Sequence, residues 1–472
     1  KEDNGAPVHA TDGRETYMNE MTGEKPGLRG NALGTAPVGR LAVSLAFPAV
    51  VAQACNALYT IIDRLFLARI PGVGDLAMTG VGVCFPILLA VSLFAALVGS
   101  GGAPLASIEL GRGDTRKAER ILGTSVAALI AISLVLPALL QLFKEPILFA
   151  FGASRDTIPY AMKFLSVYLS GTVFVQLALG LNTFITAQGK ARVAMVSTLL
   201  GAVLSVALDP LFIFTFDMGV YGAALANVVA QAVSTAWVIG FLCSRRSIMH
   251  ARDIRFDRLL GSVLMLGVSP FIMQLTECVI QVVFNSSLQR YGGDAYVGAM
   301  TIITSLMQLV WVFSNGANQG VQPIIGYNYG ARRFDRVKRA YRGMLFTLVI
   351  VNSIMVLTYA MFPVTFAGLF TSDQDITDVV VRMLPLFSCG MGVFGVQSAT
   401  QCAFVGMGQA KPSLFLAILR KIILLVPLAL ILPHIAGLGA SGVFLAEPIS
   451  DVLSAIIAGL LFRRLSPKLL AP

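Results

Sequence analysis

The chain has 472 residues, of which 56% are hydrophobic and only 13% are charged, and its mean hydropathy is +0.78. Soluble globular proteins carry about 25% charged residues, so this composition excludes a water-covered protein and indicates an integral membrane protein. A net charge of +10 would suggest nucleic-acid binding in a soluble chain, but here the basic residues gather in short loops, and no nucleic-acid partner is expected.

The predicted elements are long apolar helices that follow a polar start. Residues 1–37 are polar and rich in Gly and Pro, and we expect a disordered tail there. From Leu41 onward the apolar stretches reach the length of about 20 residues that crosses a bilayer. A soluble helical solenoid would need polar faces at the helical period, which these stretches lack. We place about twelve spans, at 41–68, 76–100, 121–143, 159–186, 193–215, 220–243, 258–288, 296–321, 341–362, 379–405, 413–433 and 441–462.

The loops alternate in charge. Lys and Arg are concentrated in every second loop, for example at 112–120, 245–258 and 332–342. The loops "FDMG" and "HIAGLG" between them contain neither residue. Cytoplasmic loops carry the excess of positive charge, so both termini are predicted to be cytoplasmic in a multi-pass protein of the cell inner (plasma) membrane.

The two halves of the sequence resemble each other. "GGAPLASIELGRGDTRKAER" begins at Gly101 and "GVQPIIGYNYGARRFDRVKR" begins at Gly320, an offset of 219 positions. Six spans per half would insert both halves in the same direction, as in alternating-access transporters whose substrate cavity lies between two lobes. Pro48 and Pro270 sit alike in the first and seventh spans and are expected to kink them. The expected domains are a tail (1–37), an N-lobe (38–244), a linker (245–257), a C-lobe (258–465) and a tail (466–472).

Two acids of the first half attract attention because carboxylates are costly inside a membrane and usually face a cavity or a partner. Asp63 in "YTIIDRLFLARI" and Asp209 in "SVALDPLFIF" are predicted at similar depth. Together they would suit a proton or a sodium ion, with oxygens from Asn56, Thr60 and Ser205 at helical spacing. The alternative is that Asp63 caps a helix end and pairs with its neighbour Arg64, while Asp209 marks an Asp-Pro turn.

The second half has its own buried charges. Glu277 lies near the middle of its span, which favours a functional role. Glu447 and Asp451 are one helical turn apart and need protons or basic partners. Arg420 and Lys421 are possible partners, although both could instead snorkel to the inner surface. For Asp451 we favour structural pairing, and for Glu447 pairing and transport remain equally open.

These features together resemble the multidrug and toxic compound extrusion (MATE) family, over residues 38–465. The resemblance rests on "IIDRLFLARI" with Pro48 fifteen residues before its acid, on "ALDPLFIF", on "GARRFDRVKRA" and on Glu277. It implies an all-α integral membrane fold of about twelve helices in two pseudo-symmetric six-helix lobes. It also implies an antiporter that expels cationic, often aromatic compounds in exchange for protons or sodium ions.

The resemblance assigns roles to single residues. Asp63 and Asp209 match the acids of a first-lobe cation site, with Asn56 as a polar neighbour and Ser205 where some relatives have asparagine. Glu277 matches the second-lobe acid of another branch of the family. The aspartate that accompanies that acid is replaced here near Phe394–Gln397, which makes Gln397 a further candidate.

The expected function is therefore secondary active multidrug efflux. The expected partners are small cationic or amphipathic compounds and the lipid bilayer, the protein is expected to work as a monomer, and no cofactor is expected beyond the coupling proton or sodium ion. The six cysteines lack C-x-x-C spacing, so no metal site is expected apart from possible sodium binding at Asp63 and Asp209. The alternatives are a lipid-linked oligosaccharide flippase of the same superfamily and, from a different class, a channel. An enzyme is least expected, since no nucleophile–base pair stands out.

Overall fold

The computed structural model describes residues 32–471 except 252, 372 and 436. Every regular element among these residues is a helix. Ten helices are long and apolar enough to cross a membrane, and two bent helix pairs bring the number of candidate spans to twelve. The predicted all-α membrane fold is therefore confirmed.

The first six spans form the N-lobe. Its elements are α3 (Val38–Ala68), α4 (Gly74–Arg112), α5 (Thr115–Ala150), α6 (Ile158–Ser170), α7 (Thr172–Ala187), α8 (Ala191–Pro210), the π-helix η1 (Leu211–Thr215) and α9 (Gly219–Cys243). The fourth span is the bent pair of α6 and α7, which meet at 57°. In the fifth span, Pro210 has no backbone N–H to donate, and α8 passes there into η1.

The other six spans form the C-lobe. Its elements are α10 (Leu259–Gly292), α11 (Asp294–Gly330), α12 (Phe334–Met361), α13 (Pro363–Gly368), α14 (Gln374–Ser388), α15 (Met391–Gly406), α16 (Ala410–Ile418), the π-helix η2 (Leu419–Leu425), α17 (Val426–Ile431), the 3-10 helix η3 (Leu432–His434) and α18 (Ala440–Leu469). The bent pair, α14 and α15 at 42°, is again the fourth span, and the π-helix is again in the fifth. The two lobes thus share their irregularities as well as their span number.

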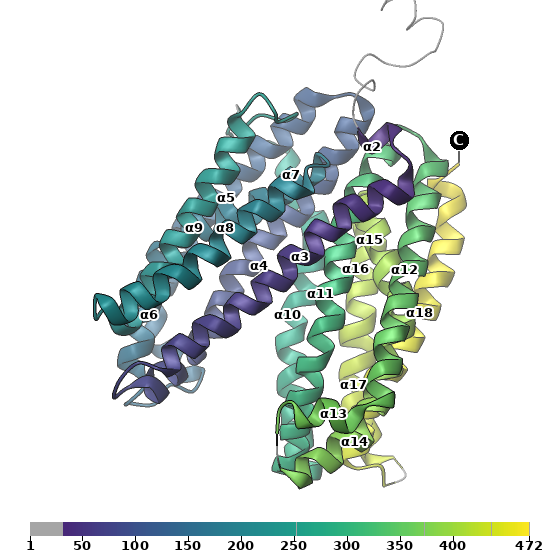
Figure 1. Ribbon diagram of the computed structural model, residues 1–472. Coiled ribbons are helices and arrows are strands. Elements are labelled where there is room, and N and C mark those ends of the chain that lie inside the picture. The colour runs from purple at the N-terminus through teal and green to yellow at the C-terminus, as the bar shows by residue number, and fades with distance from the viewer. Residues whose placement is uncertain (1–31, 252, 372, 436, 472) are drawn as a thin grey trace, which may run out of the picture.

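The lobes join at one end and diverge at the other (Figure 1). The largest hydrophobic core is shared, since it contains Leu122 and Phe184 of the N-lobe together with Ile324 and Phe404 of the C-lobe. The two next largest cores each belong to one lobe. One lies within residues 280–446 of the C-lobe, and the other lies within residues 67–224 of the N-lobe. Both described chain ends, α2 (Ala32–Thr35) and the end of α18, lie at the joined end.

Two glycines bring the lobes into backbone contact. Gly111 of α4 lies against the carbonyl oxygen of Tyr327, and Gly330 of α11 lies against the carbonyl oxygen of Ile108. Neither position has room for a Cβ atom, so only glycine permits this approach. The two contacts are equivalent under the repeat, because a shift of 219 positions converts Gly111 into Gly330 and Ile108 into Tyr327.

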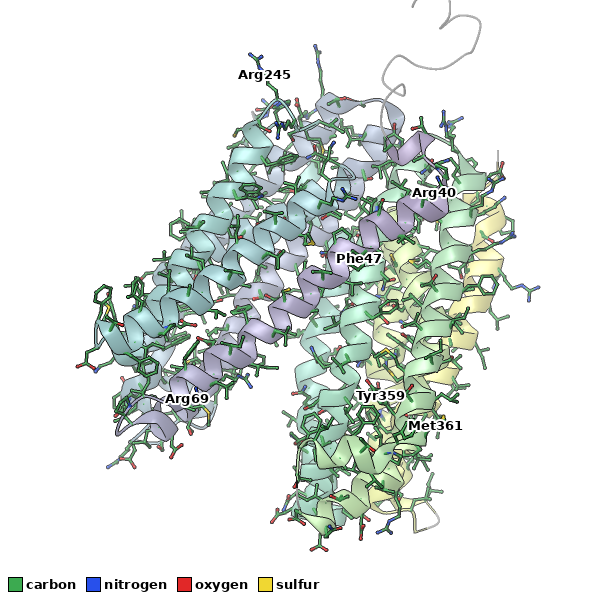
Figure 2. The ribbon with its side chains drawn as sticks, in the orientation of Figure 1. Arg40, Phe47, Arg69, Arg245, Tyr359 and Met361 are labelled. Atoms are coloured by element: carbon green, nitrogen blue, oxygen red, sulfur yellow. The ribbon has the colours of Figure 1, made fainter. Side chains whose placement is uncertain are left out.

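The joined end carries the basic loops and the first described helix, α2. Arg40 and Arg245 lie at this end, whereas Arg69 lies at the far end of α3 (Figure 2). The segment expected to be disordered reaches residue 37, yet its described part contains α2, whose Leu33 is fully buried. Residues 1–31 lie outside the described part of the chain. At the other terminus α18 continues to Leu469, beyond the expected boundary at 465. Pro48 and Pro270 lie inside uninterrupted helices, α3 and α10.

Candidate functional site

The first-lobe acids come from two neighbouring helices. Asp63 lies in the last turns of α3, and Asp209 lies in the last turn of α8 immediately before η1. Their carboxyl groups are close enough to influence each other electrostatically. Asp209 is fully buried, and neither of its carboxylate oxygens receives a hydrogen bond from the described residues. Arg64 is the charged group of opposite sign that acts on Asp63, while no cation acts on Asp209. A shared proton or a bound cation would reduce the repulsion between the two acids.

A small polar cavity lies next to this pair, between α3, α7, α8 and α9. Its volume is about 40 Å³, and its polar lining includes Asn56, Tyr59, Asn182, Ser205 and Asn227. A buried water needs about 10–15 Å³ by this measure, whereas drug-sized ligands occupy at least about 300 Å³. The cavity therefore suits a few waters or one ion. It does not suit a drug molecule.

Several acceptor atoms around the cavity lack partners. The amide nitrogen of Asn182 donates to the carbonyl oxygen of Ala194 at 3.2 Å, while its Oδ1 has no partner among the described residues. Ser205 Oγ, also buried, has none either. The phenol of Tyr59 lies close enough to interact with both Asp63 and Asp209, and so connects the cavity to the acids. Oxygen atoms that accept no hydrogen bond are free to coordinate a sodium ion or to accept a hydrogen bond from a water molecule or a protonated group.

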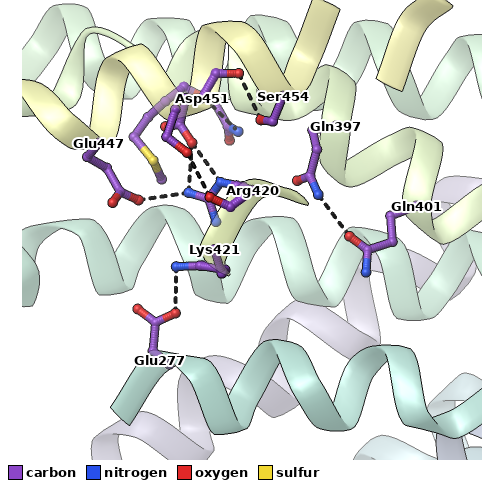
Figure 3. A network of polar contacts seen from close by, with 11 residues as sticks. Glu277, Gln397, Gln401, Arg420, Lys421, Glu447, Asp451 and Ser454 are labelled. Atoms are coloured by element: carbon purple, nitrogen blue, oxygen red, sulfur yellow. Dashed lines mark hydrogen bonds and ion pairs between the residues drawn. The ribbon is translucent and has the colours of Figure 1, made fainter. Parts of the chain in front are cut away.

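The C-lobe holds a different arrangement around Arg420, which η2 places in the interior with only 1% of its side chain exposed. Nε donates to Asp451 Oδ1 at 2.7 Å and Nη2 donates to Glu447 Oε1 at 2.8 Å (Figure 3). The guanidinium group also lies 4.3 Å from the centroid of the Phe394 ring. The edge of the guanidinium group therefore binds the two acids of α18, and its face packs on Phe394 of α15.

Lys421 makes a third ion pair in this network, alongside the two of Arg420. Its Nζ lies 2.7 Å from Glu277 Oε2 (Figure 3). The two residues are neighbours in η2, and Arg420 faces α18 while Lys421 faces α10. The lysine is 2% exposed and the glutamate is 43% exposed, so Glu277 is the accessible member of the network. The five charges sum to −1, with two cations and three carboxylates.

Amide and hydroxyl side chains form a separate set of hydrogen bonds in the C-lobe. Gln397 donates to Gln401 Oε1 at 2.9 Å, and Gln401 in turn donates to Ser269 Oγ at 3.2 Å. Ser269 and Ser413 share a further hydrogen bond of 2.7 Å. The chain of contacts links α15, α10 and α16 with groups that carry no charge, and Gln397 Oε1 remains without a partner in the described structure.

The structure brings some predicted residues together and separates others. Asp63 and Asp209 meet, with Asn56 and Ser205 on the adjacent cavity. Glu277 belongs to the other lobe and pairs with a lysine. Arg420 is the partner of both Glu447 and Asp451, as the pairing interpretation expects. Two expectations were wrong: Lys421 pairs with Glu277 and not with the acids of α18, and neither basic residue snorkels, because both are buried.

Other residues of these sites escaped the sequence analysis. Tyr59, Asn182 and Asn227 line the first-lobe cavity, and Trp311 lies 5.6 Å from the guanidinium carbon of Arg420. The signal for the amides was present, because polar side chains in apolar spans are unusual even when they carry no charge. A search for intramembrane amides as well as acids would have found them.

Twelve candidate spans, two repeated lobes and charged groups buried in each lobe define a multi-pass membrane protein of duplicated architecture. The profile of the MatE family matches residues 48–211 and 270–431, which together form more than half of the chain. The chain belongs to the MATE family of membrane transporters.

Known relatives match nearly the whole chain. The multidrug export protein MepA of Staphylococcus aureus is 23% identical over 437 residues, covering 92% of this chain and 95% of MepA. The fold is similar to that of a MATE protein crystallised in complex with MaD3S, with a TM-score of 0.87 and 23% identity over 93% of this chain and 99% of the other. An outward-facing multidrug resistance MATE transporter of the MOP superfamily gives a TM-score of 0.83 and 24% identity, covering 93% and 98%.

Proposed function

We propose that the protein exports small cationic or amphipathic, often aromatic compounds in exchange for protons or sodium ions. The observation that carries this proposal is the acid pair of the N-lobe. Asp209 is buried with both oxygens unpartnered, and its nearest charged neighbour is a second acid, Asp63. A mobile positive partner would stabilise this pair, and its binding or release would change which arrangement of the lobe is favoured.

The family membership and the relatives' names support the efflux part of the proposal. MepA is named a multidrug export protein, and this chain matches almost all of its length. In the proposed mechanism the lobes alternate between states that open to opposite membrane faces, with the present divergence of the lobes representing one state. Because the basic loops surround the joined end, we assign this end to the cytoplasm and the divergent end to the outside of the inner (plasma) membrane.

The competing functions receive less support. A flippase for lipid-linked oligosaccharides would need free cationic groups for a pyrophosphate, but the buried cations Arg420 and Lys421 are already bound to carboxylates. A channel would conduct without a coupling ion and would not need an acid pair that exchanges one. Monomeric function is part of the proposal, because each half supplies one of the two lobes.

The test is gradient-driven efflux of a cationic dye from proteoliposomes that contain the purified full-length protein. Proton and sodium gradients are imposed separately, and the variants Asp63→Asn and Asp209→Asn are compared at equal amounts of folded protein. We expect efflux to follow one of the two gradients and to fall about tenfold or more in Asp63→Asn, since the isosteric amide cannot exchange a proton or hold a cation by charge. Asp209→Asn should act in the same direction but less severely.

Asp75→Asn serves as the matched control, because Asp75 is an exposed acid in the first turn of α4. It should transport at the wild-type rate. Wild-type efflux with unchanged ion dependence in Asp63→Asn would reject the coupling role of the acid pair. Dye flux that needs neither gradient would favour a channel.

A further inference from the structure

A pocket of about 310 Å³ lies between the first turns of α3 and α12, at the joined end of the molecule. It is lined on one side by Val38 and Ala42 of α3 and on the other by Met344, Arg336 and Arg339 of α12. Its size reaches the lower end of the range for small-molecule sites. A basic mouth above an apolar wall matches a molecule that is anionic at one end and apolar at the other.

Neither arginine has an ion-pair partner among the described residues. Arg336 donates only to neutral oxygens: Asn328 Oδ1 at 2.8 Å, the carbonyl oxygen of Ala36 at 2.6 Å and that of Leu33 at 3.3 Å. Arg339 is exposed, and no hydrogen bond or ion pair of its side chain occurs in the described structure. Asp335 precedes Arg339 by one turn but forms no ion pair with it. The positive charge of these two arginines is therefore not balanced by a carboxylate of the described residues.

The N-lobe copy of this region is balanced. There, Glu109 binds Lys117 at 2.9 Å and Arg112 at 2.8 Å, and Arg120 forms an ion pair with Asp257.

The 219-position repeat places Asn328 where the N-lobe has Glu109. It places Arg336 where the N-lobe has Lys117, and Arg339 where the N-lobe has Arg120. In the C-lobe copy both positions remain basic, as Arg336 and Arg339, but the amide Asn328 replaces the acid. No described carboxylate pairs with Arg339 as Asp257 pairs with Arg120.

We propose that this pocket binds the phosphate-bearing headgroup of an anionic membrane lipid, with the start of its acyl chains against the apolar wall. The location favours a lipid over a soluble anion, because both flanking helices begin their membrane spans here and the rest of the lining is apolar. Basic pockets between transmembrane helices commonly bind anionic headgroups. In this proposal Arg339 contacts the phosphate directly. Arg336 attracts the phosphate through its charge, while its hydrogen bonds to Leu33 and Ala36 hold α2 and the residues after it. This site lies apart from the acids assigned to transport and does not depend on the proposed function.

The experiment is native mass spectrometry of the full-length protein, titrated with phosphatidylglycerol or with phosphatidylcholine of identical acyl chains. Wild type should retain phosphatidylglycerol preferentially. Arg339→Gln should reduce this preference about fivefold, the effect expected for one basic residue at an anionic surface. Gly343→Leu keeps the charge but fills the pocket, and it should have a similar effect. A Cβ atom at Gly343 meets nothing within 4 Å, so the fold should tolerate the change.

Arg120→Gln is the matched control, because Arg120 is the repeat equivalent of Arg339 but is already neutralised by Asp257. The lipid preference of this variant should equal that of wild type. Thermal unfolding of each variant verifies that the protein remains folded. Three results would overturn the proposal: equal retention of both lipids by wild type, unchanged preference in Arg339→Gln and Gly343→Leu, or an equal loss in Arg120→Gln. Complete displacement of the lipid by inorganic phosphate would also overturn it, since it would identify a site for a free anion.

Discussion

The two lobes share one architecture but treat their buried charges in opposite ways. In the C-lobe, Arg420 and Lys421 bind all three carboxylates of the network. In the N-lobe, Asp63 and Asp209 form no ion pair among the described residues, and both oxygens of Asp209 lack donors. A fixed partner stabilises a buried charge but also makes it unavailable, whereas an acid without one must recruit a mobile partner. In the proposed function, the C-lobe keeps its buried charges paired, whereas the N-lobe exchanges an ion at its acid pair.

The largest effect is expected at Arg420. Arg420→Ala leaves Glu447 and Asp451 buried without their cation, and loss of one partner of a buried pair costs about 3–5 kcal/mol of unfolding free energy. The measurement is unfolding of the purified protein in mixed micelles. If the loss arises from stranded charge, adding Asp451→Asn to the Arg420→Ala variant should recover part of it. A double variant no more stable than the single one would assign the loss to the packing of Arg420 on Phe394.

A smaller effect is expected at the partly exposed pair. Lys421→Met removes the cation from Glu277, but this glutamate is 43% exposed and water can take over part of the interaction. We expect a loss of about 1.5–3 kcal/mol, the usual range for a hydrogen bond to a charged group. The same unfolding measurement checks it, and Glu277→Gln/Lys421→Met should recover most of the loss. A cost equal to that of Arg420→Ala would mean that water does not reach Glu277.

The N-lobe acid should behave differently in the same assay. Asp209→Asn removes a buried charge that has no hydrogen-bond donor, so stability should stay unchanged or rise by up to about 1 kcal/mol while coupled transport falls. Asp451→Asn, at a paired acid of the other lobe, is the comparison and should lower stability. A loss in Asp209→Asn as large as in Asp451→Asn would remove the distinction between the lobes.

The smallest effect concerns the surface copies of the repeated loop. Arg120 beside Asp257 holds the pKa of that carboxyl below its ordinary value. A lowered pKa in the folded state means that the pair stabilises the fold above the unfolded pKa of about 4 and loses this contribution as the pH falls through the folded value. Arg120→Gln should therefore flatten the acid side of the stability curve, whereas Arg339→Gln, which has no such partner, should leave its shape unchanged. An equal change in the pH dependence of stability in both variants would show that Arg120 and Arg339 are neutralised to the same extent.

Much of the fold could be predicted from the sequence because its signals are local or repeated. Apolar length alone identifies twelve spans, and the similarity of the segments after Gly101 and Gly320 divides them into two halves. Charges in apolar spans also led to Asp63, Asp209 and Glu277. These inferences need only residue type, spacing and the cost of polarity in lipid.

The partners could not be predicted, because they depend on helix packing between distant positions. Glu277 and Lys421 are 144 residues apart, and nothing in the sequence favours this pairing over one with the acids of α18. The cavity beside Asp63 escaped because its walls are amides and hydroxyls from four helices. The π-helix at Leu419–Leu425 was not predicted from the sequence either.

The contacts of Gly111 and Gly330 have a consequence for the origin of this architecture. A contact that a two-fold rotation converts into itself is the isologous interface of a symmetric homodimer, in which one patch meets its own copy. Each half of the chain carries both the glycine and the carbonyl that receives the other half's glycine. The molecule therefore retains, inside one polypeptide, the self-complementary surface of a dimer of half-length chains. The covalent connection between the halves fixes their stoichiometry, while their mutual recognition is encoded in each half separately.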